Sequence, residues 1–129
     1  MASPAERLQQ VVLVVDDDLV VRALVVRILR TAGYQVFEAG DGAQAWTHFQ
    51  RQPTVFDILV ADVVMPRMTG TELAARVHTL RPELPVLLMS GYTPTDLLAR
   101  GLQAEHASLV TKPFNGDALV AAVRKALRA

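Results

Sequence analysis

Near its start the chain reads Val11-Val12-Leu13-Val14-Val15-Asp16-Asp17-Asp18, five β-branched or leucine residues followed by three aspartates. An apolar run of this length is too short for a helix, and its lack of alternation is typical of a strand buried on both faces. Asp18 precedes a helical pattern, where we expect its side chain to cap the helix. The segment therefore predicts a buried strand that ends in carboxylates.

Four more short apolar runs share this character, and we expect them to be strands. They are Tyr34–Phe37, Phe56–Ala61, Val86–Met89 and Leu109–Val110. Asp57 interrupts the second of these runs, and we expect it to be an exposed residue at the start of that strand.

Segments with helical periodicity fill the gaps between the strands. They run from Val20 to Leu29, from Ala43 to Phe49, from Thr71 to Leu80, from Pro94 to Arg100 and, after Asn115 as an N-cap, from Ala118 to Leu127. Strands that alternate with helices form parallel sheets covered on both faces, with right-handed crossovers. We therefore predict an α/β fold, a flavodoxin-like doubly wound (βα)5 sandwich whose parallel five-stranded sheet has the order 2-1-3-4-5.

The composition limits the chain to one small domain. Its 129 residues are expected to form a polar tail over residues 1–10 and a single domain over residues 11–129. Thirteen basic residues balance thirteen acidic ones, so there is no cationic excess for binding nucleic acid directly. Cysteine is absent, which excludes disulfides, thiolate zinc sites and a cysteine nucleophile. Without a spanning run or a signal peptide, we expect no membrane insertion and a cytoplasmic location.

Polar side chains follow four of the five predicted strands. Asp16 and Asp17 follow the first, and the others are Asp62, Ser90 and Lys112. Ligands of open parallel sheets bind outside the carboxyl ends of the strands, so we expect these side chains to meet at one edge. Converging carboxylates with no histidine or cysteine nearby suit a hard cation such as Mg²⁺.

A phosphoryl group is the ligand that this set of side chains favours. A carboxylate beside a cation can attack phosphorus, and Asp62 is the best nucleophile because it stands alone at the end of its strand. Lys112 and Ser90 would hold the phosphoryl oxygens. Lysine is rare among the thirteen cations of this chain, which favours a specific role for Lys112 as a compact charge donor.

Four motifs in order resemble the receiver domain of bacterial response regulators. They are Val14-Val15-Asp16-Asp17-Asp18, Asp62-Val63-Val64-Met65-Pro66-Arg67-Met68-Thr69-Gly70, Met89-Ser90-Gly91-Tyr92 and Lys112-Pro113-Phe114. The resemblance covers the chain from about Val11 to Leu127. It implies a phosphorelay module that is not an enzyme in the ordinary sense, because it catalyses only its own phosphorylation and dephosphorylation.

The resemblance also implies a role for each residue. Asp62 would be the phosphoacceptor, charged by a sensor histidine kinase or a histidine phosphotransfer protein. Mg²⁺ would be bound by Asp17, Asp62 and the backbone carbonyl of Val64, with Asp16 acting through a water. Ser90 would be the switch hydroxyl, Lys112 would pair with Asp62 and then with the phosphoryl group, and the Lys112–Pro113 bond would be cis. A homodimer would form through the face between the helix at Pro94–Arg100 and the last helix.

Two features depart from the family pattern. Leu109 stands where receivers often have the aromatic ring of the switch, and Gly91-Tyr92 after the serine is similar to receivers of hybrid histidine kinases. Val64 and Tyr92 occupy positions that tune hydrolysis of the acyl phosphate in this family. An apolar and a bulky residue there predict slow loss of the phosphoryl group. A stand-alone regulator and a piece of a hybrid kinase both fit these features.

Two other functions compete with the phosphoacceptor reading. A receiver-like scaffold would bind partners without phosphorylation. The intact acid pair, acceptor, hydroxyl and lysine argue against it, although Leu109 is compatible with it. A small phosphohydrolase with an aspartyl nucleophile would use Asp16-x-Asp18, but that pattern continues into Leu19-Val20 rather than the expected threonine. Among the remaining polar residues, we expect His48, His78 and His106 to be surface residues. Arg22, Arg27 and Arg30 form either a solvated face or a contact for an acidic partner.

Overall fold

A computed structural model describes residues 9–102 and 107–128 of the chain. Strands and helices alternate throughout, as the sequence predicts. In chain order the elements are β1 (Val11–Val15), α1 (Leu19–Thr31), β2 (Gln35–Ala39), α2 (Gly42–Arg51), β3 (Ile58–Asp62), α3 (Gly70–Leu80), β4 (Val86–Ser90), α4 (Pro94–Ala99), β5 (Ser108–Thr111) and α5 (Gly116–Arg128). Each predicted element is confirmed, with small shifts at its ends.

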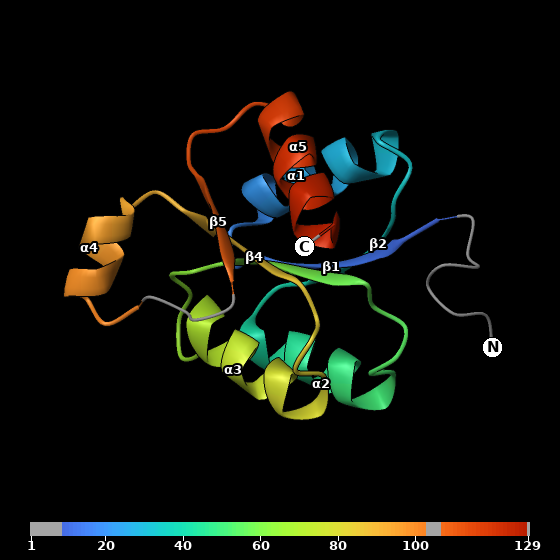
Figure 1. The fold of residues 1–129 in the computed structure, drawn as a ribbon, viewed down its shortest axis with the longest axis horizontal. Helices are drawn as coiled ribbons and strands as arrows, with labels where there is room; N and C mark the ends of the chain where they lie inside the picture. Colours follow the sequence, from blue (N-terminus) through green and yellow to red (C-terminus); the bar gives the residue numbers. More distant parts are fainter. Residues whose placement is uncertain (1–8, 103–106, 129) are drawn as a thin grey trace.

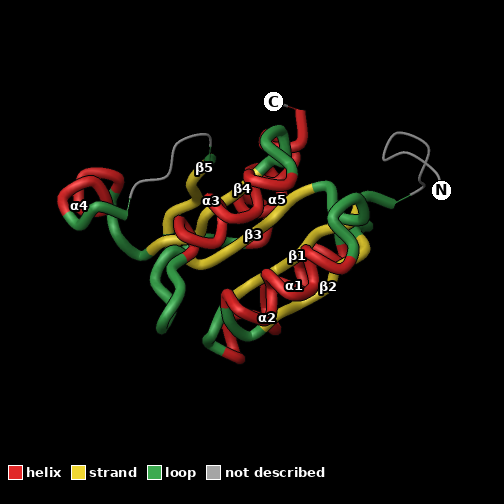
Figure 2. Tube along the Cα trace, turned by 90° about the horizontal axis from the view of Figure 1, so that it is seen from below, coloured by secondary structure: helices red, strands yellow, loops and turns green. Residues whose placement is uncertain are grey.

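The strands form one parallel sheet of order β2-β1-β3-β4-β5, which confirms the predicted doubly wound topology. Helices α1 and α5 cover one face of the sheet, and α2 and α3 cover the other (Figure 1). Helix α4 stands apart from both layers, beyond the β5 end of the sheet, in both views (Figure 1 and Figure 2).

Alternate side chains of the inner strands enter two separate cores. Val12 and Val14 pack with the apolar faces of α1 and α5, whereas Leu13 and Val15 pack with those of α2 and α3. On the second side, the Phe49 ring stacks near Trp46 and near Phe56, and these contacts anchor α2 on the sheet. Strands buried on both faces explain why the sequence shows continuous apolar runs rather than alternation.

The prediction that Asp57 is exposed is wrong. Its side chain is buried, and its Oδ2 accepts a hydrogen bond of 2.7 Å from the backbone N–H of Val11. The carboxylate thus satisfies a donor at the start of β1, which explains why a charged residue is tolerated inside an apolar segment. It ties the beginning of β1 to the segment that leads into β3.

The histidines have different environments. His48 is exposed, as expected. His78 is half-buried, and its Nε2 lies 2.9 Å from the carbonyl oxygen of Leu84, so this ring links α3 to the loop before β4 rather than being a free surface residue. His106 lies outside the described residues.

Candidate functional site at the carboxyl edge of the sheet

Three carboxylates meet where β1 and β3 end side by side. One oxygen from each of Asp16, Asp17 and Asp62 lies within 4.8 Å of the others. Strands β1 and β3 are parallel neighbours, and the pairing of Val15 with Ala61 makes both strands end at this edge. Asp16 is fully buried, Asp62 is 9% exposed, and Asp17 is exposed. The predicted meeting of these three side chains is confirmed.

Two aspartates of the turn after β1 accept hydrogen bonds from different backbone groups. Oδ1 of Asp16 accepts a hydrogen bond of 2.9 Å from the backbone N–H of Asp18. Oδ1 of Asp18 accepts from the N–H groups of Val20 and Val21, which makes Asp18 the N-cap of α1, as predicted. Asp18 is therefore committed to the helix, and Asp16 and Asp17 are left for the site.

Lys112 reaches the same cluster from the end of β5. Its Nζ donates a hydrogen bond of 3.0 Å to Oδ1 of Asp62 and lies 3.6 Å from Oδ2 of Asp16. Its backbone N–H donates to the carbonyl oxygen of Ser90 at 2.7 Å, and the Lys112–Pro113 bond is cis. One ammonium thus faces several carboxylates, so the site retains an excess of negative charge.

Burial, and to a smaller extent the neighbouring charges, shift the pKa values of the site. Burial raises the pKa of Asp16, with a further rise from the charge of Asp17, against the opposing effects of the Asp18 N–H and Lys112. Burial also raises the pKa of Asp62, and the hydrogen bond from Lys112 only partly opposes it. Burial would lower the pKa of Lys112, but the hydrogen bond and charge of Asp62, together with Asp16, outweigh burial and raise it. The folded protein therefore disfavours the ionised forms of Asp16 and Asp62.

The donor set fits a hard divalent cation. Oδ2 of Asp16 is buried and has no hydrogen-bond partner, which is costly for an ionised oxygen. The only ligand atoms in the cluster are oxygens, as Mg²⁺ prefers, and a cation among them would relieve both the repulsion and the unpartnered oxygen. These residues therefore suit the ion that the sequence predicts.

Ser90 lies at the end of β4, between the strands that carry Asp62 and Lys112. It is almost fully buried, at 1% exposure. Its Oγ accepts a hydrogen bond of 2.9 Å from the backbone N–H of Tyr92 and donates one of 3.2 Å to the carbonyl oxygen of Tyr92. The hydroxyl belongs to the correct edge of the sheet but is engaged by its own turn. Val64, two residues beyond Asp62, is 46% exposed.

Two supporting residues were not identified from the sequence. Arg22 turns inward from α1, where its Nη1 donates to the carbonyl oxygen of Asp16 at 2.9 Å and its Nε bonds Glu38 at 3.0 Å. The amide nitrogen of Gly70 donates to the carbonyl oxygen of Val63, and a Cβ at Gly70 would lie 2.3 Å from the carbonyl oxygen of Asp62. Both residues fix the backbone that presents the carboxylates.

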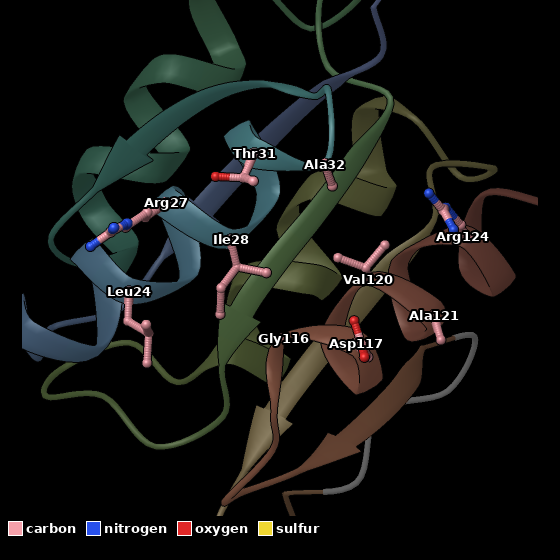
Figure 3. Close-up of a pocket in the computed structure, with 10 residues that line it drawn as sticks. All are labelled: Leu24, Arg27, Ile28, Thr31, Ala32, Gly116, Asp117, Val120, Ala121 and Arg124. Carbon is pink, nitrogen blue, oxygen red and sulfur yellow. The ribbon is translucent and has the colours of Figure 1, made fainter.

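The arginines of α1 therefore differ in role. Arg22 holds the site, and Nη2 of Arg30 donates to the carbonyl oxygen of Val36 at 3.0 Å, so neither is simply a solvated charge. Arg27 lines a groove of about 670 Å³ between α1 and α5, where Ile28 and Val120 lie among the lining residues (Figure 3). None of the site carboxylates lines this groove.

The fold and the acidic edge together define a small doubly wound α/β module with a carboxylate cluster at the carboxyl edge of its sheet, and comparison with known proteins identifies its family. The model of the response regulator receiver domain matches residues 12–124. The chain belongs to this family, so it is a receiver domain of two-component signalling and not a conventional enzyme.

Among the described residues, no helix is both long and apolar enough to span a bilayer.

Similar proteins include one that the match covers almost entirely and one that is about twice as long as the matched part. The response regulator receiver protein CpdR of Brucella abortus is 34% identical over 116 residues, which cover 90% of this chain and 95% of CpdR. The probable transcriptional regulatory protein TcrX of Mycobacterium tuberculosis is 37% identical over 91% of this chain, but the match spans only 49% of TcrX.

Solved structures agree with these sequence matches. The chemotaxis protein CheY4 of Vibrio cholerae has a TM-score of 0.80 and 31% identity, covering 92% of this chain and 98% of that one. The receiver domain of the hybrid histidine kinase CckA has a TM-score of 0.77 and 29% identity, covering 91% and 98%. Receivers that stand alone and receivers inside larger proteins are thus both similar to this chain.

Proposed function

We propose that this receiver accepts a phosphoryl group on Asp62 from a phosphohistidine, in a reaction that depends on Mg²⁺. The observation that carries the proposal is the position of Asp62, which shares a cation-sized cluster with Asp16 and Asp17 and accepts a hydrogen bond from Lys112. A nucleophile, a cation site and a fixed ammonium are the parts that phosphoryl transfer to a carboxylate needs.

The residues would share the work as follows. Asp17, Asp62 and the backbone carbonyl of Val64 would hold Mg²⁺ directly, and Asp16 would act through a water. The bound ion supplies positive charge that offsets the repulsion between carboxylates and phosphoryl oxygens. A carboxylate oxygen of Asp62 attacks phosphorus, so an O–P bond forms while the P–N bond of the phosphohistidine breaks. The imidazole leaves with that electron pair and takes up a proton.

Lys112 and Ser90 would stabilise the product. Nζ of Lys112, now on Asp62, is close enough to transfer its hydrogen bond to an oxygen of the new phosphoryl group. The Ser90 hydroxyl would turn from Tyr92 toward another oxygen. The phosphoryl group adds a charge of about −2, which would then accept hydrogen bonds from Lys112 and Ser90. New hydrogen bonds of this kind are how phosphorylation shifts a segment between two conformations.

The partner in this proposal is a sensor histidine kinase or a histidine phosphotransfer protein, in the cytoplasm. Leu19, Val20 and Leu24 are exposed by 66%, 78% and 53% on the first half of α1, directly after the carboxylates. Apolar side chains gathered beside a phosphoryl-transfer site favour docking of a partner there. A homodimer through α4, β5 and α5 is a separate proposal, which light scattering before and after phosphorylation would test.

One experiment tests the phosphoacceptor directly. The chain is incubated with Mg²⁺ and acetyl phosphate, and its intact mass is followed for wild type, Asp62→Asn and, as a matched control, the exposed α5 substitution Asp117→Asn. We expect one phosphoryl group on wild type and on the control, and none on Asp62→Asn. No adduct on wild type would favour the scaffold function, and sustained hydrolysis of general phosphate esters would favour a phosphohydrolase.

A further inference from the structure

The groove between α1 and α5 is a surface that the carboxylate site does not use. Its volume is about 670 Å³, and apolar side chains from both helices, Leu24, Ile28 and Val120, lie among its lining residues. Figure 3 shows Ile28 and Val120 in the gap between the two helices. Leu24, at the edge of the groove, is 53% exposed. Apolar side chains around an open groove of this size indicate a contact surface for another molecule.

The stripe of α5 that lines this groove has one charge of each sign. Four of the lining residues follow the spacing i, i+3, i+4 and i+7 along the helix, and they are Asp117, Val120, Ala121 and Arg124. Both charged side chains are exposed, and neither has a hydrogen bond or an ion pair with another described residue. The stripe therefore has an uncommitted carboxylate near its start, an uncommitted guanidinium two turns later, and small apolar residues between them.

This arrangement of charges is complementary to itself about a twofold axis. The midpoint between Asp117 and Arg124 lies between Val120 and Ala121. When α5 of a second copy packs antiparallel across that midpoint, Asp117 of each copy lies opposite Arg124 of the other, and the contacts are reciprocal as a twofold interface requires. The chain as a whole has a formal net charge of zero, so two copies meet no general electrostatic repulsion.

We propose that two copies of this chain associate through the groove, with their α5 helices antiparallel and the groove of each copy covered by α5 of the other. The apolar centre supplies the contact area. The two Asp117–Arg124 pairs set the direction and register of the helices, because exposed ion pairs add little affinity but penalise wrong arrangements. This face differs from the face of α4, β5 and α5, since none of the residues that line the groove comes from α4 or β5.

Self-association through this groove also limits access to the partner surface on α1. Leu24 lines the groove and belongs to the exposed apolar residues near the start of α1. A second copy that covers Leu24 excludes a phosphotransfer partner from part of its docking surface, so the dimer and the partner compete. This consequence rests on the proposed function, whereas the association itself requires neither Mg²⁺ nor phosphorylation.

Sedimentation equilibrium of the full chain, without Mg²⁺ or a phosphodonor, tests the association. Because the ion pairs are exposed, we expect a weak dimer, whose monomer–dimer equilibrium is visible between about 10 μM and 1 mM. The single variants Asp117→Arg and Arg124→Asp each place like charges opposite each other at two points, so each should raise the dissociation constant by about tenfold or more. The double variant Asp117→Arg/Arg124→Asp restores opposite charges and should return the dissociation constant to within about threefold of wild type.

The matched control is Asp96→Arg, which makes the same change of charge at an exposed residue of α4, outside the groove. It should leave the dissociation constant unchanged, and far-UV circular dichroism establishes that every variant is folded. A wild type that stays monomeric up to about 1 mM overturns the proposal, and so does a folded double variant that does not regain the dimer. A dimer weakened by Asp96→Arg but not by Asp117→Arg would form through the α4 face instead, which also overturns it. Phosphorylation by acetyl phosphate needs no docked partner, so the intact-mass test of the proposed function succeeds or fails independently of this association.

Discussion

At the scale of single side chains, the Asp16 carboxylate shows how the site is maintained at the expense of stability. It is fully buried, one of its oxygens has no hydrogen-bond partner, and burial raises its pKa. A carboxyl with a raised pKa in the folded state destabilises the fold wherever it is ionised, so its unfavourable effect is present at neutral pH and fades as pH falls through that raised value. This charge therefore opposes folding, and its use in the proposed function is to bind the cation.

Asp16→Asn should therefore stabilise the protein in the absence of divalent cations. The neutral amide preserves an oxygen acceptor for the Asp18 N–H and removes one like-charge interaction, worth about 1 kcal/mol. Urea unfolding at neutral pH, with a chelator present, would measure the gain. A lower stability than wild type would mean that attraction to Lys112 at 3.6 Å outweighs burial and repulsion.

Val64 provides a second prediction at this scale. Its apolar side chain is 46% exposed two residues after Asp62, where it would restrict the water that hydrolyses the acyl phosphate. We expect the phosphoryl group on wild type to outlast that on Val64→Asn, whose amide can hydrogen-bond that water. Decay of the adduct after removal of the phosphodonor, followed by intact mass, gives both lifetimes. A shorter wild-type lifetime contradicts this role.

At the scale of elements, the site depends on how closely the start of α3 approaches the end of β3. Thr69 and Glu72 form a capping box at the start of α3. Gly70 follows the cap, and its missing Cβ leaves room for the carbonyl oxygen of Asp62. The obstacle at this position is backbone, which yields less easily than the end of a side chain. The position of Asp62 is thus set partly by a helix that contributes no ligand.

Gly70→Ala should accordingly destabilise the protein by about 1–3 kcal/mol, the usual range for overpacking. Since relief of the clash moves the Asp62 backbone, the variant should also bind Mg²⁺ more weakly. Gly91→Ala is the matched control, because a Cβ at Gly91 meets no atom within 4 Å. Denaturant unfolding and Mg²⁺ titration would be run on both variants. Equal behaviour of the two would show that α3 does not hold β3 in place.

At the scale of the whole molecule, the topology could be predicted because β1, β3 and β4 are buried on both faces and each helix has its own period. Because parallel strands end together, the meeting of Asp16, Asp17, Asp62 and Lys112 at one edge could also be predicted. Residues whose role depends on a partner far along the chain could not. Asp57 accepts from Val11, 46 residues away, and Arg22 holds Glu38 on β2. Local sequence gives no sign of such pairings.

The global stability of the domain should consequently report whether the site holds its cation. An ion that binds only the folded chain raises the free energy of unfolding by about 1.4 kcal/mol for each tenfold increase in its concentration above the dissociation constant. We expect this dependence on Mg²⁺ for wild type and for Asp117→Asn, and a markedly weaker one for Asp62→Asn. Thermal or urea unfolding across a Mg²⁺ series measures it.

The pH dependence should reverse when the ion is added. Without Mg²⁺, Asp16 and Asp62 should lower the free energy of unfolding as pH rises. The decrease begins at their ordinary pKa of 3.8 and ends above the raised pKa values that they have in the folded protein. With saturating Mg²⁺, which binds the ionised carboxylates, stability should rise over the same interval. The contribution of the site is the difference between wild type and Asp62→Asn at each pH. A difference that is unaffected by Mg²⁺ would show that these carboxylates do not bind the ion.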